Sequence, residues 1–134
     1  MTKPLLDHLP YAQFLGLETD VHGDEVTVVM PFSDHLIGNP LIPALHGGST
    51  AALLEMAAMA KVSHTYPRLR LPRPINVSIA YLRVGKAKDV YARAQIRKAG
   101  KKVAYVTAEA WQDSQDKPIA SLTANFQLDD STGD

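Results

Sequence analysis

Apolar and polar positions follow several different rhythms along the chain, and each rhythm predicts a different kind of element. Residues 3–16 space their leucines and Phe14 at helical intervals, which predicts a short amphipathic helix that Pro10 makes irregular. Two β-branched runs, 17–21 and 25–32, flank a His-Gly-Asp sequence typical of a hairpin turn. The chain therefore opens with a short helix and a β-hairpin.

The alternation stops at residues 33–45, where two prolines and a glycine predict an irregular loop. From Gly48 to about His64 good helix formers predict a helix about 24 Å long, with Ser49 or Thr50 as its cap. Alanine, leucine and methionine leave no polar stripe on this helix, so most of its circumference should be buried.

Four strand-like runs follow the helix, at residues 74–84, 88–100, 101–113 and 117–128. Turn residues separate the last three, which predicts an antiparallel meander. A helix that is hydrophobic all round must be wrapped, and an antiparallel sheet curled around it provides that cover. We therefore expect an α+β fold in a single domain, residues 1–134, with 129–134 as a polar tail.

Composition narrows the possible partners and compartments. At 134 residues, 46% of them hydrophobic, the chain is sufficient for one core, and equal numbers of acidic and basic side chains predict neither a nucleic-acid nor a membrane partner. The absence of cysteine excludes disulfides, thiolate metal sites and a cysteine nucleophile. No secretion signal and no apolar run of about 18 residues is recognisable, so we expect a cytoplasmic protein.

Glu55 is the one carboxylate inside the apolar helix. Burial of an unpaired carboxylate is costly, so such a residue is normally paired, protonated or functional. The alternatives to a functional role are an exposed strip at the helix edge or an ion pair. Lys61, the nearest candidate partner, is six residues away and off the same face.

The sequence His46-Gly47-Gly48 stands immediately before this helix. First-turn N–H groups have no acceptor within a helix, and a glycine lets a ligand oxygen approach the backbone closely. By itself the triplet is typical of an ordinary loop-to-helix transition. Together with Glu55 it supplies the two parts that an acyl-transfer site needs, a donor for an oxyanion and a carboxylate.

The sequence gives little support for a metal site, a serine nucleophile or a nucleotide-binding site. The remaining histidines lack the spacing of metal ligands, and Ser49 is not in the context of a nucleophile, so we expect neither a metal nor a cofactor. Dinucleotide and nucleotide-triphosphate glycine motifs are absent. Basic residues gather near 83–88 and 97–102, where they predict solvated turns or, alternatively, a phosphate-binding rim.

The segment GNPLIPALHGGSTAALLEMAA resembles the signature of hotdog-fold thioesterases of the PaaI / 4-hydroxybenzoyl-CoA thioesterase type. The stretch from Ile75 to Trp111 is similar to that family's strand ending in Tyr-Leu-Arg and to the meander after it. The resemblance implies an acyl-CoA thioesterase that hydrolyses its substrate to free acid and CoA, as a homodimer that many members pair into a tetramer.

Residue by residue, the resemblance implies that Gly47 donates its N–H to the thioester carbonyl and that Glu55 acts as nucleophile or general base. It further implies that Asn39 and His46, with Gly48 beside them, line the site, and that Arg83 lies near the CoA phosphates. The chain departs from the family pattern in carrying Glu at position 55, where PaaI-like members usually have Asp. Its Asn39 also precedes His46 by seven residues instead of six.

Gly47 and Glu55 are eight residues apart, which is about 12 Å along a helix. That separation is too long for both groups to act on one carbonyl and its attacking water. If both are catalytic, a symmetric dimer must bring Gly47 of one chain near Glu55 of the other.

Two other interpretations stay open: a hotdog dehydratase or hydratase acting on β-hydroxyacyl thioesters, and a non-catalytic acyl-CoA-binding module.

Overall fold

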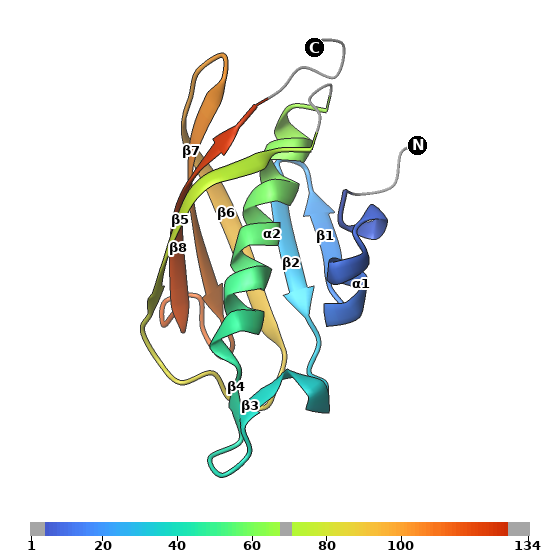
Figure 1. The fold of residues 1–134 in the computed structure, drawn as a ribbon, viewed down its shortest axis with the longest axis vertical. Coiled ribbons are helices and arrows are strands. Elements are labelled where there is room, and N and C mark those ends of the chain that lie inside the picture. The colour runs from blue at the N-terminus through green and yellow to red at the C-terminus, as the bar shows by residue number, and fades with distance from the viewer. Residues whose placement is uncertain (1–4, 68–70, 129–134) are drawn as a thin grey trace.

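A computed structural model describes residues 5–67 and 71–128, and in it one antiparallel sheet wraps around one long helix (Figure 1). The helix is α2 (Gly47–Thr65), and the sheet has six strands in the order β1-β2-β6-β7-β8-β5. The strands are β1 (Glu18–His22), β2 (Glu25–Met30), β5 (Arg73–Tyr81), β6 (Val90–Ala99), β7 (Val103–Trp111) and β8 (Ala120–Gln127). This arrangement confirms the predicted α+β hotdog fold, including the β6-β7-β8 meander.

The core lies between α2 and the inner face of the sheet. Ten residues of the helix are buried: Ser49, Thr50, Leu53, Leu54, Met56, Ala57, Ala58, Met59, Ala60 and Val62. The three meander strands face α2 mainly with alanines: Ala92, Ala94, Ala104, Ala108, Ala110, Ala120 and Ala124. Small side chains on the sheet allow the helix to approach it closely, which explains how a helix without a polar face is accommodated.

Two segments differ from their predictions. The expected N-terminal helix is divided into a 3-10 turn, η1 (Leu5–His8), and α1 (Pro10–Leu15), because proline lacks the N–H that would continue the first turn. The expected irregular loop contains a 3-10 turn, η2 (Asp34–Leu36), and a short pair of strands, β3 (Ile37–Asn39) and β4 (Ala44–Leu45). The predicted polar tail, 129–134, lies outside the described residues.

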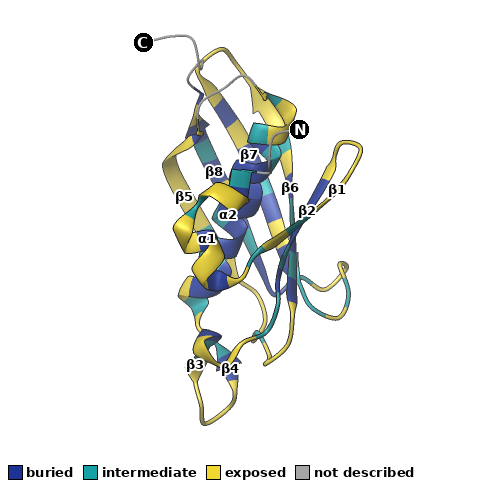
Figure 2. Cartoon of the chain, turned by 90° about the vertical axis from the view of Figure 1, so that its right-hand side faces the viewer, coloured by how far each residue is buried: buried dark blue, intermediate teal, exposed yellow. Residues whose placement is uncertain are grey.

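Strand β5 forms one edge of the sheet and pairs only with β8. Nearly all of its residues are exposed, whereas α2 is mostly buried (Figure 2). Ile75 is 56% exposed and Val77 is 36% exposed, so the edge carries apolar side chains as well as unpaired backbone groups. None of the helices in the described part of the chain combines the length and apolarity needed to cross a bilayer.

Candidate active site

The first turn of α2 is capped by the side chain of His46. His46 Nδ1 accepts a hydrogen bond from Gly48 N–H at 2.8 Å, and the His46 backbone is extended, as expected of a capping residue. The prediction that Ser49 or Thr50 caps the helix is wrong. Ser49 is buried inside the first turn, and its hydroxyl donates to the His46 carbonyl oxygen at 2.7 Å, because the helix begins three residues earlier than a Ser49 cap would require.

The remaining first-turn donors are engaged with one exception. The His46 carbonyl oxygen accepts from Ser49 N–H at 3.0 Å and from Thr50 N–H at 3.4 Å. Among the residues that the structure describes, Gly47 N–H donates no hydrogen bond. The helix therefore begins with one unpaired donor, at its positive end.

Both glycines of the triplet lie in close contact with neighbouring side chains. A Cβ on Gly47 would lie 3.2 Å from the ring of Tyr81, and a Cβ on Gly48 would lie 2.9 Å from His46 Nδ1. Tyr81 also donates its hydroxyl to the Gly47 carbonyl oxygen at 2.9 Å. Sequence reasoning did not assign a role to Tyr81; its only signal is the strand that ends in Tyr-Leu-Arg.

A cavity of about 520 Å³ opens beside Gly47, between the start of α2 and the end of β5. It brings together three of the predicted site residues, Asn39, Gly47 and Arg83. The other lining residues are mainly apolar and include Ile42, Leu45, Leu82, Val84 and Ile119. His46 and Gly48, also predicted for the site, do not line the cavity but form the cap beside it.

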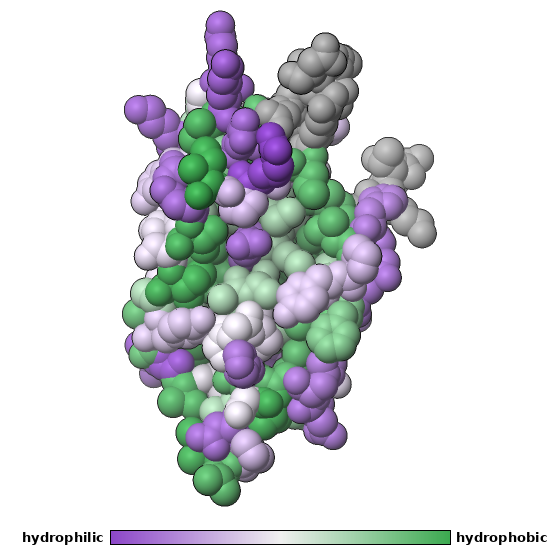
Figure 3. All heavy atoms as spheres, in the orientation of Figure 1, coloured by the Kyte–Doolittle hydropathy of each residue, from purple (hydrophilic) through white to green (hydrophobic). Residues whose placement is uncertain are grey.

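The rim of this cavity exposes apolar side chains to solvent. Ile42 is 59% exposed and Val84 is 62% exposed, and Figure 3 shows hydrophobic atoms at the lower end of the molecule, where β3 and β4 lie. Such an apolar rim is typical of an interaction or ligand site.

Asn39 and Arg83 are each held by one backbone contact. Asn39 Oδ1 accepts from Leu41 N–H at 3.1 Å, which fixes the turn between β3 and β4. Arg83 Nη1 donates to the Pro118 carbonyl oxygen at 2.6 Å, which places the guanidinium at the mouth of the cavity. Each side chain keeps further donors available to a ligand.

The loop after Arg83 is fastened to the end of β7. Gln112 accepts from Lys86 N–H at 3.0 Å and donates to the Lys86 carbonyl oxygen at 2.8 Å. Lys88 pairs with Asp113, and its hydrogen bond holds the pKa of that exposed carboxyl below its usual value. These contacts fix the segment that carries Arg83.

Glu55 lies farther along α2 and outside this cavity. Its side chain is half-buried, and in the described part of the chain it forms no hydrogen bond and no ion pair. Lys61 contacts the Asp24 carbonyl oxygen instead. Met56 and Met59, which follow Glu55 along the helix, belong to the buried core.

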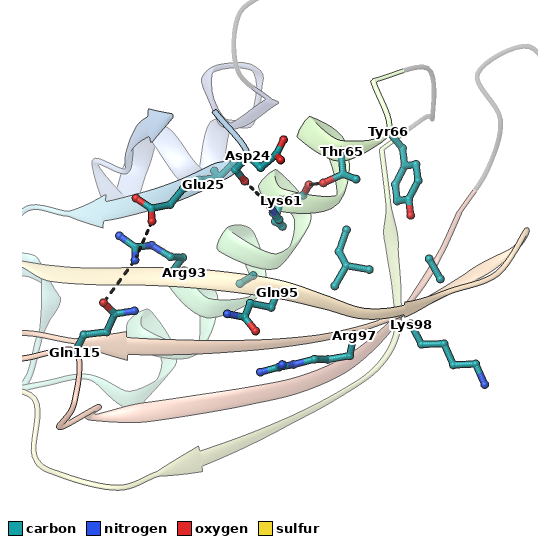
Figure 4. A pocket seen from close by; sticks show the side chains of 14 residues that line it. Asp24, Glu25, Lys61, Thr65, Tyr66, Arg93, Gln95, Arg97, Lys98 and Gln115 are labelled. Carbon is teal, nitrogen blue, oxygen red and sulfur yellow. Dashed lines mark hydrogen bonds and ion pairs between the residues drawn. The ribbon is translucent and has the colours of Figure 1, made fainter. Parts of the chain in front are cut away.

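A second, larger hollow of about 820 Å³ lies where β2 and β6 separate (Figure 4). Two of its cations, Arg93 and Lys61, are already engaged within the chain. Arg93 pairs with Glu25 at 3.3 Å and donates to Thr27 Oγ1 at 3.0 Å, and Lys61 bonds to the backbone of Asp24. This hollow is lined by Arg97 and Lys98 of the second basic cluster but by none of the predicted catalytic residues, so we take the cavity at Gly47 as the candidate site. In the described ranges, no three His, Asp or Glu side chains are grouped to hold a metal ion.

Comparison with known proteins identifies the family of the chain. The family described as the acyl-CoA thioesterase N-terminal domain matches residues 39–127, which span the site and most of the sheet. The chain belongs to this thioesterase family. The resemblance to hotdog-fold thioesterases is thereby confirmed, and so, at the level of the family, is the predicted enzyme class.

Individual relatives extend the match over nearly the whole chain. The medium/long-chain acyl-CoA thioesterase YigI of Escherichia coli is 29% identical, over 90% of this chain and 86% of YigI. A Bacillus halodurans protein crystallised with CoA is 26% identical, with a TM-score of 0.79 over 90% of this chain and 78% of its own. E. coli PaaI shares the fold, with a TM-score of 0.78 at 21% identity over 91% of this chain and 86% of PaaI.

Proposed function

We propose that this protein hydrolyses acyl-CoA thioesters of medium or long chain length to free acid and CoA. The observation that carries the proposal is the unpaired N–H of Gly47, which stands at the positive end of α2 and beside an apolar cavity. A donor in this position is suited to the carbonyl oxygen of a thioester, on which negative charge develops during hydrolysis.

The Gly47 N–H and the Glu55 carboxylate have different roles in the proposed reaction. With Glu55 as general base, the carboxylate takes a proton from water, and the hydroxide adds to the thioester carbon while Gly47 N–H stabilises the oxyanion. Collapse of the intermediate breaks the C–S bond, and the CoA thiolate takes the proton back from Glu55. With Glu55 as nucleophile, the carboxylate adds first, expels the CoA thiolate to form an anhydride, and water then hydrolyses that anhydride.

Two chains are needed to bring the groups together. Gly47 and Glu55 are about 12 Å apart along α2, and Glu55 is half-buried without a partner in its own chain, insofar as the structure describes it. The exposed apolar edge of β5 offers a surface through which a second copy could extend the sheet. A homodimer formed in this way, paired again into a tetramer, would create equivalent sites.

The cavity lining supports the choice of substrate. Apolar residues such as Ile42, Leu82 and Val84 suit an alkyl chain. The relative YigI is named as a thioesterase of medium- and long-chain acyl-CoA, which supports the same choice. Arg83 at the mouth suits the phosphates of CoA, since guanidinium groups bind phosphate oxygens strongly. Asn39 supplies a further polar contact beside Gly47.

The test is incubation with a series of acyl-CoA esters from C2 to C18 in the presence of a thiol reagent. Release of free CoA that is greatest for medium or long saturated chains supports the proposal. Formation of enoyl-CoA from β-hydroxyacyl-CoA without free CoA would indicate a dehydratase. Binding of acyl-CoA without either product would indicate a non-catalytic module.

A further inference from the structure

The peptide unit between Gly47 and Gly48 is held at both of its polar groups. Its carbonyl oxygen accepts from the Tyr81 hydroxyl at 2.9 Å, and its N–H donates to His46 Nδ1 at 2.8 Å. The unit cannot rotate without losing both hydrogen bonds.

Tyr81 reaches this peptide from the sheet. It is the last residue of β5 and pairs across the sheet with Ala120 of β8, so its backbone is fixed although its side chain is 58% exposed. Its ring lies directly against Gly47, within 3.2 Å of the place where a Cβ would stand. The phenol therefore restrains Gly47 both by contact and by a hydrogen bond.

Restraint matters here because glycine has more backbone freedom than any other residue. The unpaired Gly47 N–H belongs to the preceding peptide unit, whose carbonyl oxygen, on His46, accepts from the Ser49 hydroxyl and from the N–H groups of Ser49 and Thr50. The two units are joined through the backbone torsions of Gly47, so the first turn of α2 and Tyr81 together set the direction of this N–H. A hydrogen-bond donor stabilises an oxyanion most when it is already oriented before the reaction. We infer that Tyr81 is a positioning residue that orients the Gly47 N–H toward the thioester carbonyl.

This inference rests on the proposed function, and the Tyr81→Phe variant tests it because it removes only the hydroxyl. Loss of one neutral hydrogen bond should lower kcat about three- to tenfold, with KM for acyl-CoA within twofold of wild type. The pH profile of kcat should not move, because the phenol exchanges no proton with the substrate. Tyr105→Phe is the matched control, since Tyr105 lies on β7 away from the cavity.

A second measurement is independent of activity. The ¹⁵N order parameter of Gly47 should fall in Tyr81→Phe from a value near that of rigid backbone, about 0.85, and should be unchanged in Tyr105→Phe. The melting temperature shows whether the fold is retained.

The results of these experiments distinguish the inference about Tyr81 from the proposed thioesterase function. An unchanged Gly47 order parameter overturns the inference, and so does a normal kcat or a shifted pH profile in Tyr81→Phe. Absence of hydrolysis by the wild-type protein overturns the proposed function and the catalytic part of the inference together. The order parameter then still decides whether Tyr81 restrains Gly47.

Discussion

Gly47 and Glu55 lie on the same helix, eight residues and about 12 Å apart along its axis, and only Gly47 lines the cavity. One chain thus presents the proposed oxyanion donor in a cavity that no carboxylate lines. Farther along the same helix it presents a carboxylate without a cavity. This separation is the physical basis of the first two predictions.

The first prediction concerns the carboxylate. Glu55→Gln keeps the size of the side chain and removes the base, so kcat should fall by a factor on the order of 10²–10⁴. Steady-state kinetics with the preferred acyl-CoA measures the loss. Glu109→Gln is the control, because Glu109 is an exposed residue of β7 that does not line the cavity. Near-native turnover of Glu55→Gln would disprove the assignment.

The second prediction concerns assembly. Gly47→Val crowds the Tyr81 ring and should inactivate the donor, while Glu55→Gln inactivates the base. When the two inactive proteins are unfolded, mixed and refolded together, half of the dimers are mixed, and each mixed dimer has one intact site. About a quarter of wild-type activity should return.

Mass spectrometry must confirm that mixed dimers form in that experiment, and circular dichroism must show that Gly47→Val is folded. If confirmed heterodimers remain inactive, both groups act within one chain, and the two-chain site is wrong.

The third prediction concerns the cap formed by His46. His46→Ala removes the acceptor for Gly48 N–H and should lower the free energy of unfolding by about 1 kcal/mol, as typical for loss of a cap. kcat should fall as well, because the Gly47–Gly48 peptide loses one of its two anchors. His46→Asn should retain most of both quantities, since asparagine is a strong capping residue. Urea titration and kinetics check this, and an alanine variant as stable and active as wild type would contradict it.

The fourth prediction distinguishes the two basic clusters. If Arg83 binds the CoA phosphates, Arg83→Ala should raise KM about tenfold, with kcat little changed, and high salt should reduce the difference from wild type. Arg97→Ala is the comparison, because Arg97 lies on β6 and bonds to Thr107. A rise in KM confined to Arg97→Ala would place the phosphates at the other cluster.

Local patterns accounted for most of the fold. The composition of residues 48–64 predicted a buried helix, and the observed bounds of α2 differ by one residue at each end. Alternation predicted the meander strands, because side-chain period is a property of the strand itself. Local reasoning singled out the triplet His46-Gly47-Gly48, and Gly47 of this triplet lines the cavity.

Contacts between segments that are distant in the sequence could not be predicted from local patterns. Tyr81 and Gly47 are 34 residues apart, and no local pattern indicates that they meet. Histidine is not among the preferred capping residues, so the propensities favoured Ser49 and Thr50 over His46. The edge position of β5 depends on its pairing with β8, which is a property of the whole sheet.

The alanines that cover the inner face of the meander leave little adjustable volume beneath α2. A larger side chain there would push the helix outward at a cost of about 1–3 kcal/mol and would carry Gly47 away from Tyr81. New substrate preferences are therefore expected to arise, in nature or by directed evolution, from the segments 39–45 and 82–85 at the cavity rim. In this fold the core constrains the position of the proposed donor, whereas the selectivity of the pocket is free to diversify.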